Sequence, residues 1–323
     1  MDQPNRPKHV VSISLGTSKR DKKSETEFLG IPFIVERRGT DGDKQRFREL
    51  VAELDGTVDC FGVGGTDAWL FAGDRRYAIR ETLDLMRGAV KTPWVDGSGL
   101  KHTLERETVA WLQDNGIVDF RDKRVLLMSA VDRFGMGEAL SKRAKEVVYG
   151  DLIFGLGIPI AIRSWSTVKR LARLALPIIA RCPISWFYPT GEKQEVNTPK
   201  HERFFHDADV IAGDWHIIRR YMPEDMRGKI VLTQSSRAHE VELLRQRGVK
   251  TLITTTPEIG GDAFATNVME SVLVVLIRRR PDELTPEDYM GTLRRLGWQP
   301  SVREMNPPVT GTDAIAETAA PNL

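Results

Sequence analysis

The sequence predicts an α/β protein made of two α/β domains, the second of which contains a Rossmann-like doubly wound parallel sheet. The first observation is segment 124–151, where an apolar run, a glycine-bearing turn, a helix-forming stretch and a second apolar run follow one another. The second is the return of apolar runs that end in small polar residues near positions 209, 230 and 251. Strands that alternate with helices in this way are typical of parallel sheets.

Length and composition set the limits of this expectation. A chain of 323 residues is long enough for about two domains. We expect an N-terminal α/β substrate domain at 1–118 and a Rossmann-like nucleotide-binding domain, with C-terminal helices, at 119–323. With 41% hydrophobic and 28% charged residues the chain is typical of a globular protein, and a net charge of +2 gives no reason to expect nucleic acid as a partner.

The number of cysteines and the hydropathy of the chain indicate the cellular compartment in which the protein is expected. Cys60 and Cys182 are too few for a disulfide framework or a zinc site, so we expect no metal and a reducing cytoplasm. The N-terminus lacks the apolar stretch of a signal peptide, and the longest apolar runs are shorter than the roughly 20 residues of a spanning helix. We therefore expect a cytoplasmic protein without a membrane partner, and a homo-oligomer is left open.

The N-terminal half reads as alternating strands and helices. Strands are predicted at 9–15, 31–37 and 58–63, and helices at 45–54, 75–86 and 103–113.

The third predicted strand ends in Gly64, Gly65 and Thr66. Adjacent glycines let a backbone approach a ligand closely, and open α/β sheets bind at the carboxyl ends of their strands. These three residues are candidates for substrate binding. A tight turn without a ligand explains the same glycines equally well.

Segment 96–102 concentrates chemically active residues just before a predicted helix. Lys101 could act as a general acid or base if burial lowers its pKa, with Asp96 as its electrostatic partner. The alternative is that Asp96 caps a turn while Lys101 and His102 are solvated.

The turn between the first predicted strand and helix of the second domain suggests a phosphate site. It contains Asp132, Arg133, Gly135 and Gly137, and a helix N-terminus beside a strand end favours an anion. Asp151 ends the next strand, where a dinucleotide fold holds the ribose hydroxyls. The single G-x-G is also compatible with an ordinary turn that binds nothing.

A further strand end carries three hydroxyls, those of Thr254, Thr255 and Thr256. Such hydroxyls suit contacts to a cofactor or a substrate.

The phrases ADVIAGD, PEDMRGKIVLT and VKTLITTTP, at 208–214, 223–233 and 249–257, resemble the second half of the cofactor domain in the quinate and shikimate 5-dehydrogenase family. That resemblance implies a substrate domain followed by a Rossmann domain that binds NAD or NADP. By the same resemblance, Lys101 takes the place of the catalytic lysine, and Ser12 and Ser14 the place of the serine pair that holds the substrate carboxylate. The motifs N-V-T-x-P-x-K and N-T-D are absent.

Three function classes follow. The first is an NAD- or NADP-dependent oxidoreductase acting on a small anionic hydroxy or oxo compound. Asp151 favours NAD, whereas nearby Lys142, Arg143 and Lys145 could offset that preference. The second is a transferase with a nucleotide-activated donor between two Rossmann-like domains. The third is a non-catalytic protein that binds a nucleotide or a metabolite.

Overall fold

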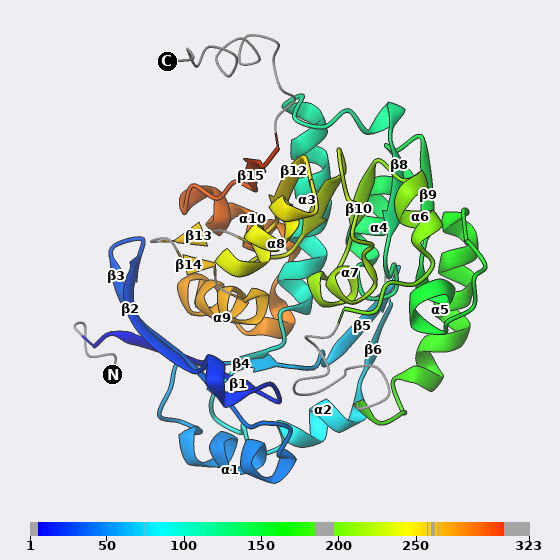
Figure 1. The fold of residues 1–323 in the computed structure, drawn as a ribbon. Coiled ribbons are helices and arrows are strands. Elements are labelled where there is room, and N and C mark those ends of the chain that lie inside the picture. Colours follow the sequence, from blue (N-terminus) through cyan, green and yellow to red (C-terminus); the bar gives the residue numbers. More distant parts are fainter. Residues whose placement is uncertain are drawn as a thin grey trace, which may run out of the picture.

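The computed structural model describes residues 6–73, 75–184, 197–256, 258–259, 262–263 and 265–306. Two sheets dominate the fold and form two lobes (Figure 1). The prediction of two α/β domains is confirmed, and each domain contains a largely parallel sheet.

The N-terminal lobe is built on a five-stranded sheet. Its central strands run parallel, and only the edge strand β2 is antiparallel to its neighbour. In spatial order the strands are β2 (Lys22–Phe28), β3 (Ile31–Gly39), β1 (Lys8–Ser14), β4 (Cys60–Gly64) and β7 (Trp94–Val95). β1 is covered on both faces, and its last five residues, Val10 to Ser14, are all buried.

The C-terminal lobe is built on a six-stranded sheet. Five strands are parallel and β15 pairs antiparallel at one edge. The order is β15 (Ser301–Glu304), β12 (Thr251–Thr254), β11 (Ile230–Thr233), β10 (Val210–Ala212), β8 (Arg124–Leu127) and β9 (Glu146–Tyr149). The five strands predicted for this half are present and parallel, whereas β15 was not predicted.

Helices cover both faces of each sheet. On the N-terminal sheet, α1 (Lys44–Leu54) packs on one face and α9 (Thr266–Ile277) on the other, so a late segment of the chain completes the first lobe. On the C-terminal sheet, one face carries α3 (Ser98–Asp114), α4 (Phe134–Ser141) and α5 (Trp165–Ile179). The other face carries α6 (Glu202–Asp207), α7 (Trp215–Tyr221) and α8 (Ala238–Gln246). α10 (Pro286–Arg295) packs against α3 and α9.

The helix predicted at 75–86 is wrong in its first half. Strand β6 (Arg75–Ala78) pairs antiparallel with β5 (Trp69–Ala72), and only α2 (Arg80–Leu85) is helical. Pairing with the preceding strand overrides the local helix propensity. A second short hairpin joins β13 (Glu258–Ile259) and β14 (Asp262–Ala263).

The two sheets share one connectivity. In each, the first strand lies between the second and the third parallel strands, as β1 lies between β3 and β4 and β8 lies between β9 and β10. On the two sides of this first strand the strand order runs in opposite directions. In open α/β sheets such a point leaves a crevice at the carboxyl ends of the strands, where ligands bind. Within the described part of the chain, no helix combines the length and the apolar character needed to cross a membrane.

Candidate functional site

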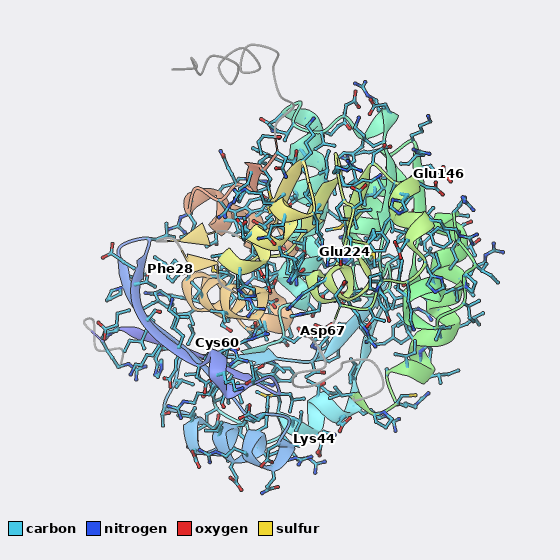
Figure 2. The ribbon with its side chains drawn as sticks, viewed as in Figure 1. Phe28, Lys44, Cys60, Asp67, Glu146 and Glu224 are labelled. Atoms are coloured by element: carbon cyan, nitrogen blue, oxygen red, sulfur yellow. The ribbon has the colours of Figure 1, made fainter. Side chains whose placement is uncertain are left out.

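Residues that follow strands of both sheets converge in the interior of the molecule. Asp67 follows β4, Asp132 and Arg133 follow β8, and Asp214 follows β10. Figure 2 shows Asp67 near the middle of the view, whereas Lys44 and Glu146 lie toward its edge. The loops at the carboxyl ends of the two sheets therefore supply one common site.

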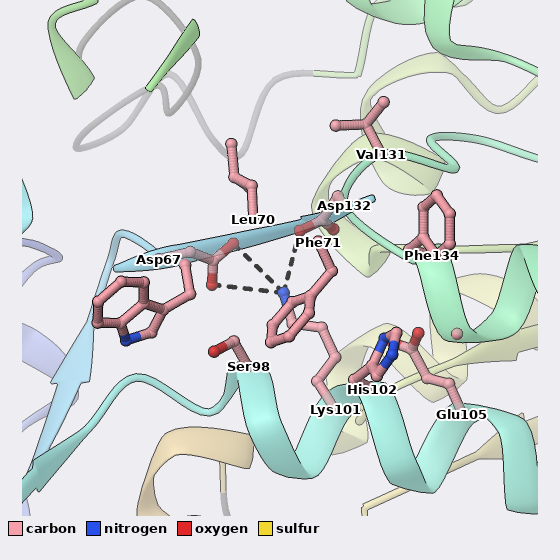
Figure 3. Close-up of a pocket in the computed structure, with 12 residues that line it drawn as sticks. Asp67, Leu70, Phe71, Ser98, Lys101, His102, Glu105, Val131, Asp132 and Phe134 are labelled. Atoms are coloured by element: carbon pink, nitrogen blue, oxygen red, sulfur yellow. Dashed lines mark hydrogen bonds and ion pairs between the residues drawn. The ribbon is translucent and has the colours of Figure 1, made fainter. Parts of the chain in front are cut away.

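Lys101 connects the two lobes at this site. It lies in the first turn of α3, and its Nζ is 3.3 Å from both carboxylate oxygens of Asp67 and 3.0 Å from Oδ1 of Asp132 (Figure 3). The side chain of Lys101 is only 14% exposed. An ammonium with three donors thus bridges one carboxylate from each lobe.

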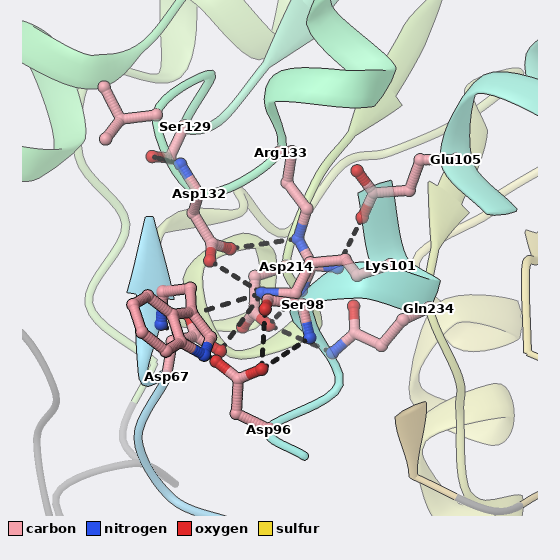
Figure 4. A network of polar contacts seen from close by, with 12 residues as sticks. Asp67, Asp96, Ser98, Lys101, Glu105, Ser129, Asp132, Arg133, Asp214 and Gln234 are labelled. Carbon is pink, nitrogen blue, oxygen red and sulfur yellow. Dashed lines mark hydrogen bonds and ion pairs between the residues drawn. The ribbon is translucent and has the colours of Figure 1, made fainter. Parts of the chain in front are cut away.

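Arg133 forms the second cationic centre of the network (Figure 4). Its Nη1 donates to Glu105 at 2.7 Å and its Nη2 to Asp214 at 2.7 Å, while its Nε lies 2.9 Å from Oδ2 of Asp132. Gln234 Nε2 donates to the same Asp214 oxygen at 3.0 Å. Charge-assisted contacts of this kind hold the loop after β8 against α3 and α7.

The ionisation of these groups follows from burial and pairing. Burial opposes the charge of Lys101, but the carboxylates of Asp132 and Asp67 outweigh it and raise the Lys101 pKa. Burial likewise opposes ionisation of Asp132, and the charges of Lys101 and Arg133 overcome it and lower that pKa. At neutral pH Lys101 is protonated, so it does not have the lowered pKa that was expected of a general base.

Asp96 was predicted to be the electrostatic partner of Lys101, but in the structure it binds other groups. Its Oδ2 accepts from Ala68 N at 2.6 Å and Trp69 N at 2.9 Å, and its Oδ1 accepts from Ser98 N and Ser98 Oγ. Asp96 therefore binds Ser98, the first residue of α3, and fixes the chain that enters the β5–β6 hairpin. Asp67 and Asp132 are the carboxylates that Lys101 contacts instead.

A small cavity adjoins the ion pairs. It is lined by Asp67, Lys101 and Asp132 on its polar side, and its remaining lining includes the aromatic side chains of Trp69, Phe71, His102 and Phe134. His102 stacks on Phe71 with ring centroids 4.6 Å apart, and burial followed by the charge of Arg106 lowers the His102 pKa to about 4. A volume of about 10 Å³ holds about one water molecule.

Backbone donors of the loop after β8 are occupied by a carboxylate of the protein itself. The carboxylate of Asp151 accepts from Ala130 N at 3.0 Å, from Val131 N at 2.9 Å and from Ser129 Oγ at 3.2 Å. Asp151 was predicted to bind a ribose, but its carboxylate instead binds one hydroxyl and two backbone donors of the loop after β8.

The two glycines of the predicted phosphate turn serve packing instead. A Cβ on Gly135 would lie 2.5 Å from the carbonyl oxygen of His102, and one on Gly137 would lie 2.9 Å from the ring of Trp165. Both residues are buried within α4. They permit α4 to lie close to α3 and α5, so the prediction that this turn binds a dinucleotide is wrong.

The predicted serine pair is engaged in internal hydrogen bonds. Ser12 Oγ accepts from Asn267 Nδ2 at 2.7 Å, and Ser14 Oγ accepts from Gly16 N at 3.1 Å. Ser12 thereby fastens β1 to α9.

The candidates at the end of β4 lie next to the site without lining its cavity. Gly65 has a φ of 76°, Gly64 lies against Ser14, and Thr66 Oγ1 is 3.0 Å from Thr82 Oγ1. These residues shape the turn that presents Asp67.

The three threonines lie at the carboxyl end of the C-terminal sheet as predicted. Thr255 N and Thr256 N donate to Thr233 O and Gln234 O, which continues the pairing of β11 with β12. The hydroxyls of Thr254 and Thr256 are buried and have no hydrogen-bond partner among the described residues.

The site also contains carboxylates that were not predicted. Asp67, Asp214 and Glu105 supply three of the network's acidic groups. Asp67 and Asp214 each come within three residues after a strand, which is the signal that could have identified them. Glu105 lies on a helix face, and nothing local to its sequence distinguishes it. Among the described residues no group of His, Cys, Asp and Glu side chains is arranged to hold a metal ion.

A wider groove opens beside the cavity, with a volume of about 990 Å³, and shares Trp69, Phe71, Ser98 and His102 with it. Glu270 lies along this groove, where its Oε1 accepts from Tyr289 Oη at 2.7 Å. Burial, followed by the charge of Asp96, raises the Glu270 pKa to about 8.

Solved structures similar to this chain include sugar-binding proteins. A sugar ABC transport substrate-binding protein from Bordetella parapertussis 12822 is 11% identical with a TM-score of 0.35, covering 93% of this chain and 89% of that chain. A periplasmic solute-binding protein from Actinobacillus succinogenes 130z with bound D-allose is 10% identical with a TM-score of 0.36, covering 93% and 98%. AraP, an arabinose binding protein from Geobacillus stearothermophilus, is 8% identical with a TM-score of 0.39, covering 93% and 97%.

No curated protein matches the chain. The geometry of the loop after β8 corrects the expected function. The loop after β8 is closed by Asp151. The predicted membership of the quinate and shikimate 5-dehydrogenase family, the NAD(P)-dependent oxidoreductase activity and the NAD or NADP cofactor are therefore wrong.

Family models cover nearly the whole described chain. Residues 9–96 match a domain of unknown function (DUF8753), and residues 99–305 match a domain of unknown function (DUF8754). The first match contains β1 to β7, and the second begins within the first turn of α3. The second match spans more than half of the residues of the chain. The chain therefore belongs to the family described as the domain of unknown function DUF8754.

Proposed function

We propose that this protein binds a small polar molecule between its two lobes, at the network around Lys101. The observation that carries the proposal is the convergence of charged residues from both lobes on one cavity with an aromatic wall. Ligand sites commonly lie between domains and combine aromatic surface with a few polar groups. We also propose that the C-terminal sheet is Rossmann-like, as the sequence predicts. Ligands of such doubly wound sheets bind at the carboxyl ends of the strands, which is where the network lies.

The charges of the network favour a neutral or cationic ligand rather than the anionic one expected from the sequence. Asp67, Asp132 and Asp214 face two cations, Lys101 and Arg133. A ligand hydroxyl or amine can donate to these carboxylates, and a hydroxyl can also accept from Lys101. An added carboxylate or phosphate would meet an excess of negative charge.

Binding requires the lobes to separate slightly. The cavity holds about one water molecule in this arrangement, so a ligand must displace the contacts of Lys101 with Asp67 and Asp132. Hinge motion between two domains is a common route to such a site. In the arrangement described, the contacts of Lys101 with Asp67 and Asp132 join the two lobes.

A thermal-shift screen tests the proposal. The panel contains monosaccharides, polyols, amino sugars and polyamines, together with sugar phosphates and dicarboxylates as anionic counterparts. A bound compound at a hundred times its Kd should stabilise the fold by about 2.7 kcal/mol. Asp132→Asn should weaken that compound at least about tenfold through a lost charge-assisted hydrogen bond. Asp225→Asn, at a surface carboxylate paired with Arg227, should not.

Two outcomes would overturn the proposal. One is a panel in which no neutral or cationic compound shifts the melting temperature. The other is a stabilising compound whose affinity is the same in Asp132→Asn and in the wild type.

The cytoplasmic location stays a prediction, supported by the two free thiols of Cys60 and Cys182.

A further inference from the structure

The outer surface of α5 concentrates exposed apolar side chains. Among the described residues eight large hydrophobic side chains are exposed, and six of them lie within 156–178. Those six are Leu156, Ile158, Ile160, Leu171, Leu174 and Ile178. Leu174 is 73% exposed and Ile178 is 66% exposed, so these side chains project into solvent. An accumulation of this kind within one segment, here α5 and loop 156–160, marks an interaction surface.

The same segment is basic and contains no acidic residue. From 152 to 191 the sequence has five basic residues, Arg163, Lys169, Arg170, Arg173 and Arg181, and no Asp or Glu. Arg163 pairs with Glu146, but the other four form no ion pair with any described residue. The segment therefore presents unneutralised positive charge next to its exposed apolar side chains.

Helical spacing places these groups together on one face of α5. Val168, Ala172 and Leu176 recur at four-residue intervals and are buried against the protein core. Leu171, Leu174 and Ile178 recur at three and four residues and point outward, and Arg170 and Arg173 lie beside them. In Figure 1, α5 lies at the right-hand edge of the molecule.

We infer that the outward face of α5, together with loop 156–160, docks on an anionic lipid bilayer. Helices that lie in a membrane interface combine Leu and Ile with Lys and Arg and lack a spanning length. The aliphatic side chains would enter the boundary of the acyl chains, and the arginines and the lysine would contact anionic headgroups.

Other occupants fit the surface less well. A second copy of the same face would bring two sets of four unpaired cations together, which disfavours a symmetric dimer there. Hot spots for protein partners are enriched in Trp, Tyr and Arg, with Leu under-represented, whereas the exposed apolar side chains here are all Leu or Ile. A bilayer satisfies both the charge and the aliphatic character of the face. This inference does not depend on the ligand site.

Vesicle sedimentation tests the inference with the full-length protein. The wild type should bind vesicles of phosphatidylcholine that contain phosphatidylglycerol, should bind pure phosphatidylcholine much less, and should release with added salt. Arg170→Gln with Arg173→Gln should weaken binding roughly 25-fold, at about fivefold for each cation. Leu174→Ser with Ile178→Ser should weaken it at least about tenfold.

Matched changes outside the face serve as controls. Val90→Ser replaces a side chain that is 82% exposed, and Arg227→Gln replaces an arginine whose side chain is 82% exposed. Both controls should bind as the wild type does, and circular dichroism should show all variants folded. Failure of the wild type to bind the anionic vesicles overturns the inference, as does equal binding by the Arg170/Arg173 variant. Binding to polyglutamate but not to vesicles would assign the face to an acidic protein instead.

Discussion

Replacing Lys101 with methionine tests whether the ion pairs of the site hold the lobes together. Methionine keeps the length of the side chain but removes the ammonium that contacts Asp67 and Asp132. Those carboxylates are 13% and 20% exposed, so in the variant they would remain in a largely buried site without the ammonium of Lys101. Removing one partner of a buried pair costs about 3–5 kcal/mol. Because Asp132 keeps Arg133 and the site is not fully dry, we expect about 2–3 kcal/mol near neutral pH.

The cost should depend on pH in a defined direction. In the wild type the pKa of Asp132 is lowered, so its contribution to stability is present above the unfolded pKa and is lost as the pH falls through the folded pKa. Lys101 has a raised pKa, so its own contribution persists until the pH rises above its ordinary value. In Lys101→Met the carboxylates become neutral on acidification, and the difference from the wild type should shrink by about 1–2 kcal/mol between about pH 7 and about pH 4.5.

Urea unfolding followed by far-ultraviolet circular dichroism measures both quantities. Lys142→Met is the matched control, because Lys142 forms an exposed pair with Glu138 and should cost less than about 0.5 kcal/mol. The double change of Lys101→Met and Asp132→Asn should recover part of the loss, since it also removes one of the two carboxylates that lose the Lys101 ammonium. A cost below about 1 kcal/mol for Lys101→Met, or one that does not change with pH, would refute this account of the network.

Two further predictions concern the neighbourhood of the site. Glu270 has a folded pKa of about 8, so wild-type stability should fall as the pH rises from about 4.5 towards that value, by up to about 5 kcal/mol from this group. Glu270→Gln, which keeps an acceptor for Tyr289, should remove this decline in thermal unfolding measured at about pH 5 and pH 8; an unchanged slope would contradict the raised pKa. Gly135→Ala should destabilise the fold by about 1–3 kcal/mol in urea, because its Cβ would approach the carbonyl oxygen of His102 to 2.5 Å. If Gly135→Ala is as stable as the wild type, the prediction is wrong and α4 can move away from α3.

The sequence determined the order of elements along most of the chain. Apolar runs that end in small polar residues marked β8, β9, β10, β11 and β12, and their alternation with helical stretches predicted a parallel sheet. Because each of these strands is covered on both faces, its apolar run is continuous and visible in the sequence alone. Lys101 was also identified from the sequence, because it lies in the charged and glycine-bearing segment 96–102, which contains the first turn of α3.

Partners across the fold could not be obtained from the sequence. Asp67 and Asp132 lie 34 and 31 residues from Lys101, and only the meeting of the two sheets at their carboxyl ends brings the three side chains together. Asp151 matched the position of a ribose-binding carboxylate, yet the folded chain turns it back onto the loop after β8.

The physical reason is the range of the interactions involved. Hydrophobic periodicity and turn chemistry act between near neighbours, so they specify strands and helices locally. The charge state of a buried lysine and the occupancy of a loop's N–H donors depend on groups that tertiary packing brings within hydrogen-bond distance. For this protein, the sequence therefore determined where the parallel strands lie along the chain. The tertiary structure alone decided that α9 completes the N-terminal lobe and which side chains meet between the lobes.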